Sequence, residues 1–263
     1  MGSATTQALA ATRTALGALG PAELSVASEL LAAVRVIGAT PQLRTALTDN
    51  EADAAQKRAL VESVFGGKIS AGAASLLVSA ASSRWSSAAD FLAGAEELGI
   101  RVAARASGDA EVDAELFAFD RTVSGDSELE LALGSKLGGP EPKAALVDRL
   151  LGGKASPATV TIVRHLVQQP RGRRIGEMLR GAASVVADER GFDVATVTTA
   201  VPLTAEQLAR LERGLAVQAG RPIRFDTIVD PAVVGGVRVQ IGDDVIDGSV
   251  ASRLNELRQK LAG

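Results

Sequence analysis

The sequence has no cysteine, no tyrosine and a single histidine, His165, and aromatic residues make up only 3% of its 263 positions. The absence of cysteine excludes disulfides, thiolate nucleophiles and cysteine-ligated zinc or iron. A single histidine excludes metal sites built from several histidines. These absences exclude much of the familiar chemistry of enzymes, including catalytic triads that contain histidine or cysteine.

The sequence also lacks a large excess of charge of one sign, and it lacks long apolar runs. Lysine and arginine total 28 against 31 aspartate and glutamate residues, which gives a net charge of -3. This balance argues against a protein whose main task is to neutralise nucleic-acid phosphates. No stretch approaches the roughly 18 to 20 consecutive apolar residues of a membrane-spanning helix, and the first residues lack the pattern of a signal peptide. The sequence predicts neither nucleic-acid binding nor direct membrane insertion.

Apolar residues recur at helical spacing up to about residue 189. One stripe spans residues 24–37 and another spans residues 60–65, with apolar side chains three and four positions apart on one helix face. The pairs Gly66-Gly67 and Gly152-Gly153 are typical of helix C-termini. Because alanine is abundant, we expect short amphipathic helices that pack closely through small side chains.

The helical part repeats itself. Residues 28–70 align without a gap on residues 114–156, at an offset of 86, with 15 identities in 43 positions. Lysines and paired glycines keep their places in this register; Lys57, for example, falls on Lys143. The unit is too long for a usual solenoid repeat, so each copy is expected to be a small helical bundle.

In the C-terminal part the spacing of the apolar residues changes from that of helices to that of strands. Residues 192–201 and 221–229 are β-branched and strand-like, and Thr204 with Gln207 forms a capping box for a helix between them. Residues 233–241 alternate between apolar and polar side chains, which predicts a third strand.

The chain after this third strand is expected to turn, pair briefly and enter a last helix. Residues 242–244 form the turn, 245–247 a short return strand, and Ser249 the helix cap. The apolar residues of that helix are spaced four, three and four apart on one narrow stripe: Val250, Leu254, Leu257 and Leu261. Such a stripe needs a partner, either the domain's own sheet or another protein's helix.

The expected fold class is α+β, with internally duplicated all-helical bundles followed by a small C-terminal α/β domain. We expect the domains to be residues 1–108, 109–189 and 190–263. Residues 88–106 are expected to close the first bundle and to open the second.

The stretch VVGGVRVQIGDDVIDGSV, residues 233–250, admits three interpretations. An EF-hand calcium loop needs oxygen ligands at alternating positions and a closing glutamate, which are missing here. A phosphate-binding loop needs a glycine-rich turn before a helix, but Gly235-Gly236 precede a strand. We favour a structural interpretation of the whole stretch. Gly235 and Gly236 form a bulge or a close backbone approach, Gly242, Asp243 and Asp244 a hairpin turn, and Asp247, Gly248 and Ser249 a helix start. An enzyme that uses the carboxylates of Asp243, Asp244 and Asp247 is disfavoured, because no second functional group accompanies them.

Residues 164–180, RHLVQQPRGRRIGEMLR, carry five arginines. A nucleic-acid surface would need interleaved aromatic residues, which are missing. A helix corner with a solvated basic face, or a contact with an acidic partner, fits the composition better. The alternative function is therefore a helical adaptor that binds RNA or an acidic partner through Arg164 to Arg180.

The stretch VDPAVVGGVRVQIGDDVIDGSVASRLNELRQKL, preceded by VTTAVPLTAEQLARLERGL, resembles the delta-subunit family of F-type ATP synthases. That family includes the mitochondrial oligomycin-sensitivity-conferring protein. A Gly-Gly strand, Ile-Gly-Asp, an Asp-Gly-Ser turn and a leucine-spaced final helix occur in the family in this order. The resemblance covers about residues 114–263, whereas residues 1–108 look like an extra copy of the helical bundle.

The resemblance implies a peripheral-stalk (stator) subunit that is not an enzyme and has no catalytic residue, no metal site and no cofactor of its own. Such a subunit serves ATP synthesis and proton transport through the complex. In the family, the helical bundle receives the N-terminal helix of an alpha subunit, and the C-terminal domain binds the end of the b-subunit coiled coil. A peripheral position at the cytoplasmic face of the bacterial plasma membrane is also implied. The contacts implied are Leu254, Leu257 and Leu261 toward the b subunits, and Leu76, Leu77 or their repeat counterparts Ile162 and Val163 toward the alpha-subunit helix.

Overall fold

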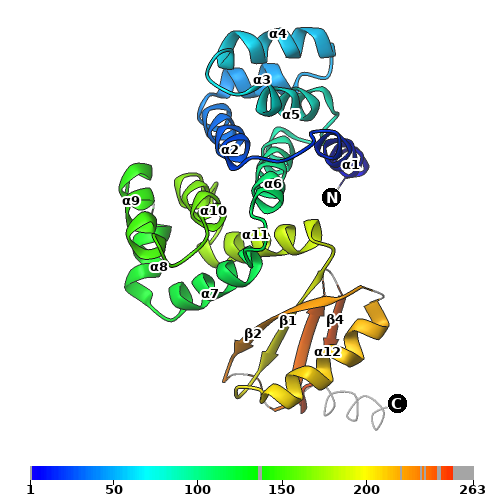
Figure 1. Cartoon of the computed structure of the whole chain (residues 1–263), viewed down its shortest axis with the longest axis vertical. Helices are drawn as coiled ribbons and strands as arrows, with labels where there is room; N and C mark the ends of the chain where they lie inside the picture. Colours follow the sequence, from blue (N-terminus) through cyan, green and yellow to red (C-terminus); the bar gives the residue numbers. More distant parts are fainter. Residues whose placement is uncertain are drawn as a thin grey trace, which may run out of the picture. The chain divides into compact units, whose positions relative to one another are not determined.

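The computed structural model describes residues 2–135, 138–219, 221–231, 233, 235–241 and 244–250. The chain divides into two compact units, Met1–Val186 and Ala187–Gly263. Within the described residues the first unit contains helices only, whereas the second combines strands with helical segments (Figure 1). The expected α+β fold class is confirmed.

The helical unit follows the amphipathic pattern of the sequence. Its helices are α1 (Ser3–Gly17), α2 (Leu24–Ala39), α3 (Pro41–Thr48), α4 (Ala54–Phe65), α5 (Ala71–Ser82), α6 (Ala88–Ala106), α7 (Val112–Ser124), α8 (Ser127–Gly134), α9 (Pro140–Leu151), α10 (Pro157–Gln168) and α11 (Ile175–Glu189), which continues into the second unit. Side chains that accept backbone N–H groups begin several of them, including Ser70 at α5, Ser87 at α6 and Ser156 at α10. These caps satisfy donors that the first helical turn leaves unpaired.

The helix bounds recur at the offset of the sequence repeat. The bounds of α3, α4 and α5 return as those of α8, α9 and α10, each displaced by 86 residues (127 − 41, 140 − 54 and 157 − 71). A polar contact recurs with them, because Glu29 accepts the backbone N–H of Ser70 at 2.7 Å and Glu115 accepts that of Ser156 at 3.0 Å. These observations agree with a duplication, which stays a prediction about the origin of the chain.

Helix α6 is the most deeply buried part of the helical unit, with twelve of its nineteen residues buried. It packs along α2, and α10 contacts both α2 and α6. A Cβ added to Gly99 of α6 would lie 2.5 Å from Cδ2 of Leu31 on α2, so this glycine permits the close approach. One core therefore runs through both expected bundles, and residues 1–186 form one unit. A boundary near residue 108 stays a prediction.

The C-terminal unit is a sheet of four described strands with a helix packed on one face. Its elements are β1 (Asp193–Thr199), α12 (Ala205–Ala219), β2 (Ile223–Val229), β3 (Val237–Ile241) and β4 (Asp244–Asp247). The strand order is β2-β1-β3-β4, with β1 parallel to β2 and the other pairs antiparallel. Val197, Val239 and Leu215 belong to its core. The expected capping box begins α12, because Thr204 Oγ1 accepts the N–H of Gln207 at 3.2 Å and Gln207 Oε1 accepts that of Thr204 at 2.9 Å.

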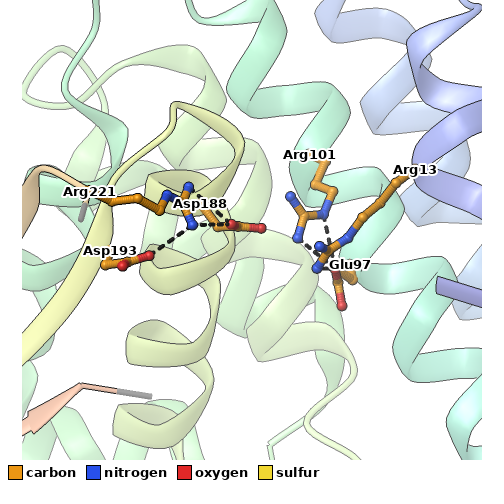
Figure 2. Close-up of polar contacts among 6 residues, drawn as sticks. All are labelled: Arg13, Glu97, Arg101, Asp188, Asp193 and Arg221. Atoms are coloured by element: carbon orange, nitrogen blue, oxygen red, sulfur yellow. Dashed lines mark hydrogen bonds and ion pairs between the residues drawn. The ribbon is translucent and has the colours of Figure 1, made fainter. Parts of the chain in front are cut away.

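Each unit also contains a cluster of ion pairs that joins separate segments of the chain (Figure 2). In the helical unit, Arg13 of α1 lies 3.1 Å from the carboxylate of Glu97 on α6. In the C-terminal unit, Arg221 lies 3.3 Å from Asp188, near the end of α11, and 2.8 Å from Asp193 at the start of β1. Because these side chains are partly exposed, each pair stabilises the fold by at most about 1 kcal/mol.

Candidate partner-binding site

The four apolar residues that the resemblance implies for an alpha-subunit helix lie in the core of the helical unit. Leu76 and Leu77 on α5 are 1% and 0% exposed, and Ile162 and Val163 on α10 are both 0% exposed. A partner helix could reach them only if the helices separated. They therefore form no surface of this chain in the described structure.

The residues implied for the b subunits, Leu254, Leu257 and Leu261, lie outside the described residues. The expected turn residues Gly242 and Asp243 do so as well. Val250, the first member of the predicted stripe, is described, and 45% of it is exposed. The apolar face that would continue from it is known here from the sequence alone.

Gly235 and Gly236 let the chain before β3 run directly against the chain after β4. Both have positive φ, 66° and 84°, in the left-handed region that favours glycine. A Cβ on Gly236 would lie 2.5 Å from the carbonyl oxygen of Gly248 and 2.9 Å from Cα of Ser249. The N–H of Val250 donates to the carbonyl oxygen of Gly235 at 3.2 Å. In this structure the two glycines serve a backbone contact that positions the segment leading into Val250.

Asp247 fixes the same segment from the end of β4. Its Oδ1 accepts the backbone N–H of Ser249 at 2.9 Å, and Arg238 is its cross-strand neighbour on β3. Hydrogen bonds from the side chain and then the backbone of Ser249, together with the charge of Arg238, lower the pKa of Asp247. The carboxylate is thus ionised at neutral pH and caps the chain where the last helix is expected to begin.

Replacing Asp247 by alanine should destabilise the C-terminal unit and speed amide exchange at Ser249 and Val250. Because the folded pKa of Asp247 is lowered, its stabilising effect is present at neutral pH and is lost as the pH falls through that folded value. Hydrogen exchange followed by mass spectrometry would measure the change, with Asp244→Ala on the same exposed strand as the matched control. A calcium-binding signal that Asp247→Ala abolishes would contradict this structural role.

A buried ion cluster joins the middle of α6 to the turn after α10. The carboxylate of Glu96, whose side chain is 6% exposed, lies 2.7 Å from Nη2 of Arg171. Both Nη atoms of Arg173 donate to it, at 2.6 Å and 3.0 Å, and such bidentate pairs are among the stronger charge-assisted hydrogen bonds. Arg171 has a φ of 50°, which is uncommon for a residue with a Cβ. Its pairing with Glu96 holds the turn in this conformation.

His165 completes the cluster, and its two neighbours determine which ring nitrogen carries the proton. Its Nε2 lies 3.0 Å from Glu96 and its Nδ1 lies 3.3 Å from Nη1 of Arg35. Because Arg35 can only donate, Nδ1 accepts, and the proton of the neutral ring lies on Nε2 and is donated to Glu96. Burial lowers the pKa of His165, against the opposing effect of Glu96. Burial raises the pKa of Glu96, but hydrogen bonds from His165 and Arg173 and the charge of Arg171 outweigh it and lower that pKa to about 2.

The basic segment 164–180 is largely neutralised inside the chain. Arg164 lies 3.3 Å from Asp148 of α9, and Arg180 lies 2.7 Å from Asp120 of α7. Two further arginines pair with Glu96 in the cluster above. Four of the five arginines therefore have carboxylate partners, and an adaptor that binds RNA or an acidic partner through this corner is not supported.

The described residues contain neither a single membrane-spanning helix nor a metal cluster. No single helix there is long and apolar enough to cross a membrane; α2 and α3 reach that length and composition only together, and they are bent by 107°. No group of three or more histidine, cysteine, aspartate or glutamate side chains is arranged there to hold a metal ion.

Comparisons with known proteins match the whole chain. The family described as ATP synthase delta (OSCP) subunit matches residues 100–261. The ATP synthase subunit delta of Leifsonia xyli subsp. xyli is 52% identical over 265 residues, which cover 100% of both chains. Those of Pseudarthrobacter chlorophenolicus and Streptomyces griseus subsp. griseus are 37% and 38% identical, over 276 and 271 residues, and each alignment covers 100% of both chains.

These relatives also align with residues 1–99, which the family match does not reach. The part of the chain that is expected to be the first helical copy is therefore shared with these three relatives. The signature around Gly235 and Asp247 lies inside the matched region. The chain belongs to the ATP synthase delta (OSCP) subunit family.

Proposed function

We propose that this chain joins the catalytic head of an F-type ATP synthase to its membrane-anchored b subunits. As a family member it is a structural subunit of the peripheral stalk, without catalysis of its own, and it binds other ATP synthase subunits. The observation that carries the proposal is the match to an ATP synthase subunit delta at 52% identity over the full length of both chains.

The two units suggest a division of this task. We infer that the helical unit binds the N-terminal helix of an alpha subunit and that the C-terminal unit binds the end of the b subunits. A stalk must transmit force without yielding, and the shared core along α6, with the ion cluster at Glu96, supports a stiff helical unit. The exposed side chain of Val250, which begins the leucine-spaced stripe, supports the C-terminal contact.

We further infer a peripheral position at the cytoplasmic face of the bacterial plasma membrane, reached through the complex. The relatives that align over the full length come from Leifsonia, Pseudarthrobacter and Streptomyces. Binding to membrane-bound subunits accounts for such a position, so the chain needs no segment of its own in the bilayer.

Calorimetry of the full chain tests this proposal. We expect heat on titration with a synthetic alpha-subunit N-terminal helix and, separately, with the soluble end of the b subunit, with little dependence on salt. Val250→Asp should weaken b-subunit binding by about tenfold or more, because it places a charge on an apolar contact, and should leave alpha-helix binding unchanged. Val229→Asp, at a position 48% exposed in the same unit, is the matched control.

Absence of heat in both titrations would contradict the stalk function. A Val250→Asp variant that loses alpha-helix binding but keeps b-subunit binding would instead contradict the division of the task between the units. Affinity that falls steeply with salt would indicate an electrostatic surface in place of apolar helix packing.

A further inference from the structure

A pocket of about 510 Å³ lies where α3, the start of α6 and the turn after α10 meet. Its polar lining consists of Arg44 from α3 and of Gln169, Arg171 and Arg173 from the turn. Among the described residues, no aspartate or glutamate lines it. Three arginines around one pocket whose lining has no carboxylate create a positive potential that attracts anions.

Two contacts at Gly38, near the end of α2, bring the walls of the pocket together. Nη1 of Arg44 donates to the carbonyl oxygen of Gly38 at 3.1 Å. A Cβ added to Gly38 would lie 1.8 Å from Nε2 of Gln169, so the turn packs directly against this glycine. The guanidinium of Arg44 and the turn that carries Arg171 and Arg173 therefore meet at the same point, although they are far apart in the sequence.

The arginines of the pocket have too few acceptors. Glu96 pairs with both Arg171 and Arg173, and it also meets His165. Burial lowers the pKa of Arg171, and the charge of Arg173 lowers it further, against the effect of Glu96. Nε of Arg171 is buried without a hydrogen-bond partner. One carboxylate is thus shared by two arginines with Arg44 beside them, and an unpaired buried donor in such a cluster indicates a missing acceptor.

The lining of the pocket suits a small oxyanion. A guanidinium group presents a planar fork of N–H donors that matches the oxygens of phosphate. Helix α6 begins at Ala88 on the pocket wall, and the partial positive charge of its N-terminus adds to the attraction. Among the described residues no aromatic side chain lines the pocket, so none is placed to stack on a nucleotide base. These features favour inorganic phosphate over a nucleotide.

We propose that this pocket binds inorganic phosphate, with Arg44, Arg171 and Arg173 as its cationic ligands. The proposal goes beyond the stalk function and does not depend on it, because the pocket belongs to the chain alone. Bound phosphate joins α3 and the start of α6 to the turn after α10, and it therefore stabilises the folded helical unit.

Calorimetry of the full chain with inorganic phosphate, in chloride buffer of low ionic strength, tests the proposal. We expect saturable binding at one site with a Kd of about 1 mM or lower, which about two charge-assisted hydrogen bonds can supply. ADP should bind no more tightly than phosphate. Absence of saturable heat up to about 10 mM phosphate, tenfold above that Kd, would overturn the proposal. ADP binding that is about tenfold tighter than phosphate binding would also overturn it, because the site would then recognise a nucleotide.

Arg44→Gln tests the location of the site while the ion cluster keeps its charges, since Glu96 pairs with Arg171 and Arg173. This variant should weaken phosphate binding by about tenfold, the loss expected for one charge-assisted hydrogen bond. Arg58→Gln, at an exposed arginine of α4 that does not line the pocket, is the matched control and should bind phosphate like the parent chain. Equal weakening in both variants would mean general attraction to positive charge and would contradict a specific site.

Ala93→Glu supplies a second test that removes no cation. Ala93 is an exposed residue of the pocket wall on α6, so a glutamate there places a carboxylate beside the arginines. We expect this carboxylate to compete with phosphate and to weaken its binding by about tenfold or more, whereas the matched control Ala93→Gln retains binding. Unchanged phosphate binding in Ala93→Glu would overturn the proposed location.

Hydrogen exchange followed by mass spectrometry locates the bound anion independently. Saturating phosphate should slow amide exchange in residues 88–93 and 169–173 of the full parent chain and leave exchange in the C-terminal unit unchanged. Slowing confined to other segments would contradict the proposal. Because all of these measurements use the chain without its partners, their failure leaves the stalk function untouched.

Discussion

Replacing Glu96 by glutamine should lower the free energy of unfolding of the helical unit by about 3 kcal/mol. Glutamine keeps the shape of the side chain but removes the charge that balances Arg171 and Arg173. Both guanidinium groups would stay partly buried without an anionic partner, and breaking a buried pair in this way is costly because the remaining charge is desolvated. For a unit of this size the loss corresponds to a midpoint lowered by about 6 to 12 °C.

Thermal and urea unfolding of the full chain, followed by circular dichroism, would measure this loss. Glu62→Gln on the exposed face of α4 is the matched control and should change stability by no more than about 0.5 kcal/mol. If the Glu96→Gln variant were as stable as the parent chain, the charge of Glu96 would contribute nothing to the free energy of unfolding, and the proposed role of the cluster in holding α6 to the turn after α10 would be wrong.

The stability gap between the parent chain and Glu96→Gln should depend on pH. The pKa of Glu96 is lowered from 4.5 to about 2 in the folded chain, so the unfolded chain binds a proton at this site at higher pH than the folded one. The stability that the carboxylate contributes is therefore complete above about pH 4.5 and is lost as the pH falls toward 2. A shift of this size corresponds to about 3 kcal/mol, so the gap should close over that range.

Urea unfolding midpoints of the parent chain and of Glu96→Gln, recorded between pH 7 and pH 3, would measure how this difference in stability depends on pH. Carboxylates that do not contact residue 96 titrate in both chains and cancel in the difference. His165 does not cancel, because Glu96 raises its pKa in the parent chain alone. A gap that stays constant down to pH 3 would mean that the loss in Glu96→Gln comes from packing. The lowered pKa of His165 adds a separate loss below about pH 6.5 in both chains, because the unfolded state takes up the proton first.

Much of the fold is determined by local patterns that can be read directly. The pair Thr204 and Gln207 predicts the start of α12 because both halves of the capping box lie within one turn. Paired glycines at 66 and 152 predict the ends of α4 and α9 for a similar reason, since the helix stops where residues without a Cβ follow. The alternation along residues 237–241 predicts which face of β3 is buried.

Long-range contacts could not be predicted in the same way. Leu76 and Ile162 belong to an apolar face, but periodicity does not reveal that a neighbouring helix already covers it. The arginines near residue 171 suggest a basic surface until the fold brings Glu96 to them from α6. One signal was available, because a glutamate in the largely apolar run of residues 88–106 needs a cationic partner when it is buried. Nothing local identifies which arginine supplies it.

The segment from Gly235 to Ser249 could be predicted from the sequence only in part. Its glycines and Asp247 could be interpreted as a turn from their residue types, and the contact of Gly236 with Gly248 gives the physical reason for two consecutive glycines. The segment that this contact positions begins with Val250. In this structure the two glycines and Asp247 position the chain, and partner binding is proposed for the residues that follow them.

The central claim is that one chain connects two partners, and head binding to membranes tests it most directly. Membrane vesicles that carry the b subunits, but from which the catalytic head and this chain have been removed, are mixed with purified head in the presence or absence of the full chain. We predict that the head sediments with the vesicles only when the chain is present, and that Val250→Asp reduces this binding whereas Val229→Asp does not. Equal binding of the head with and without the chain would contradict the account.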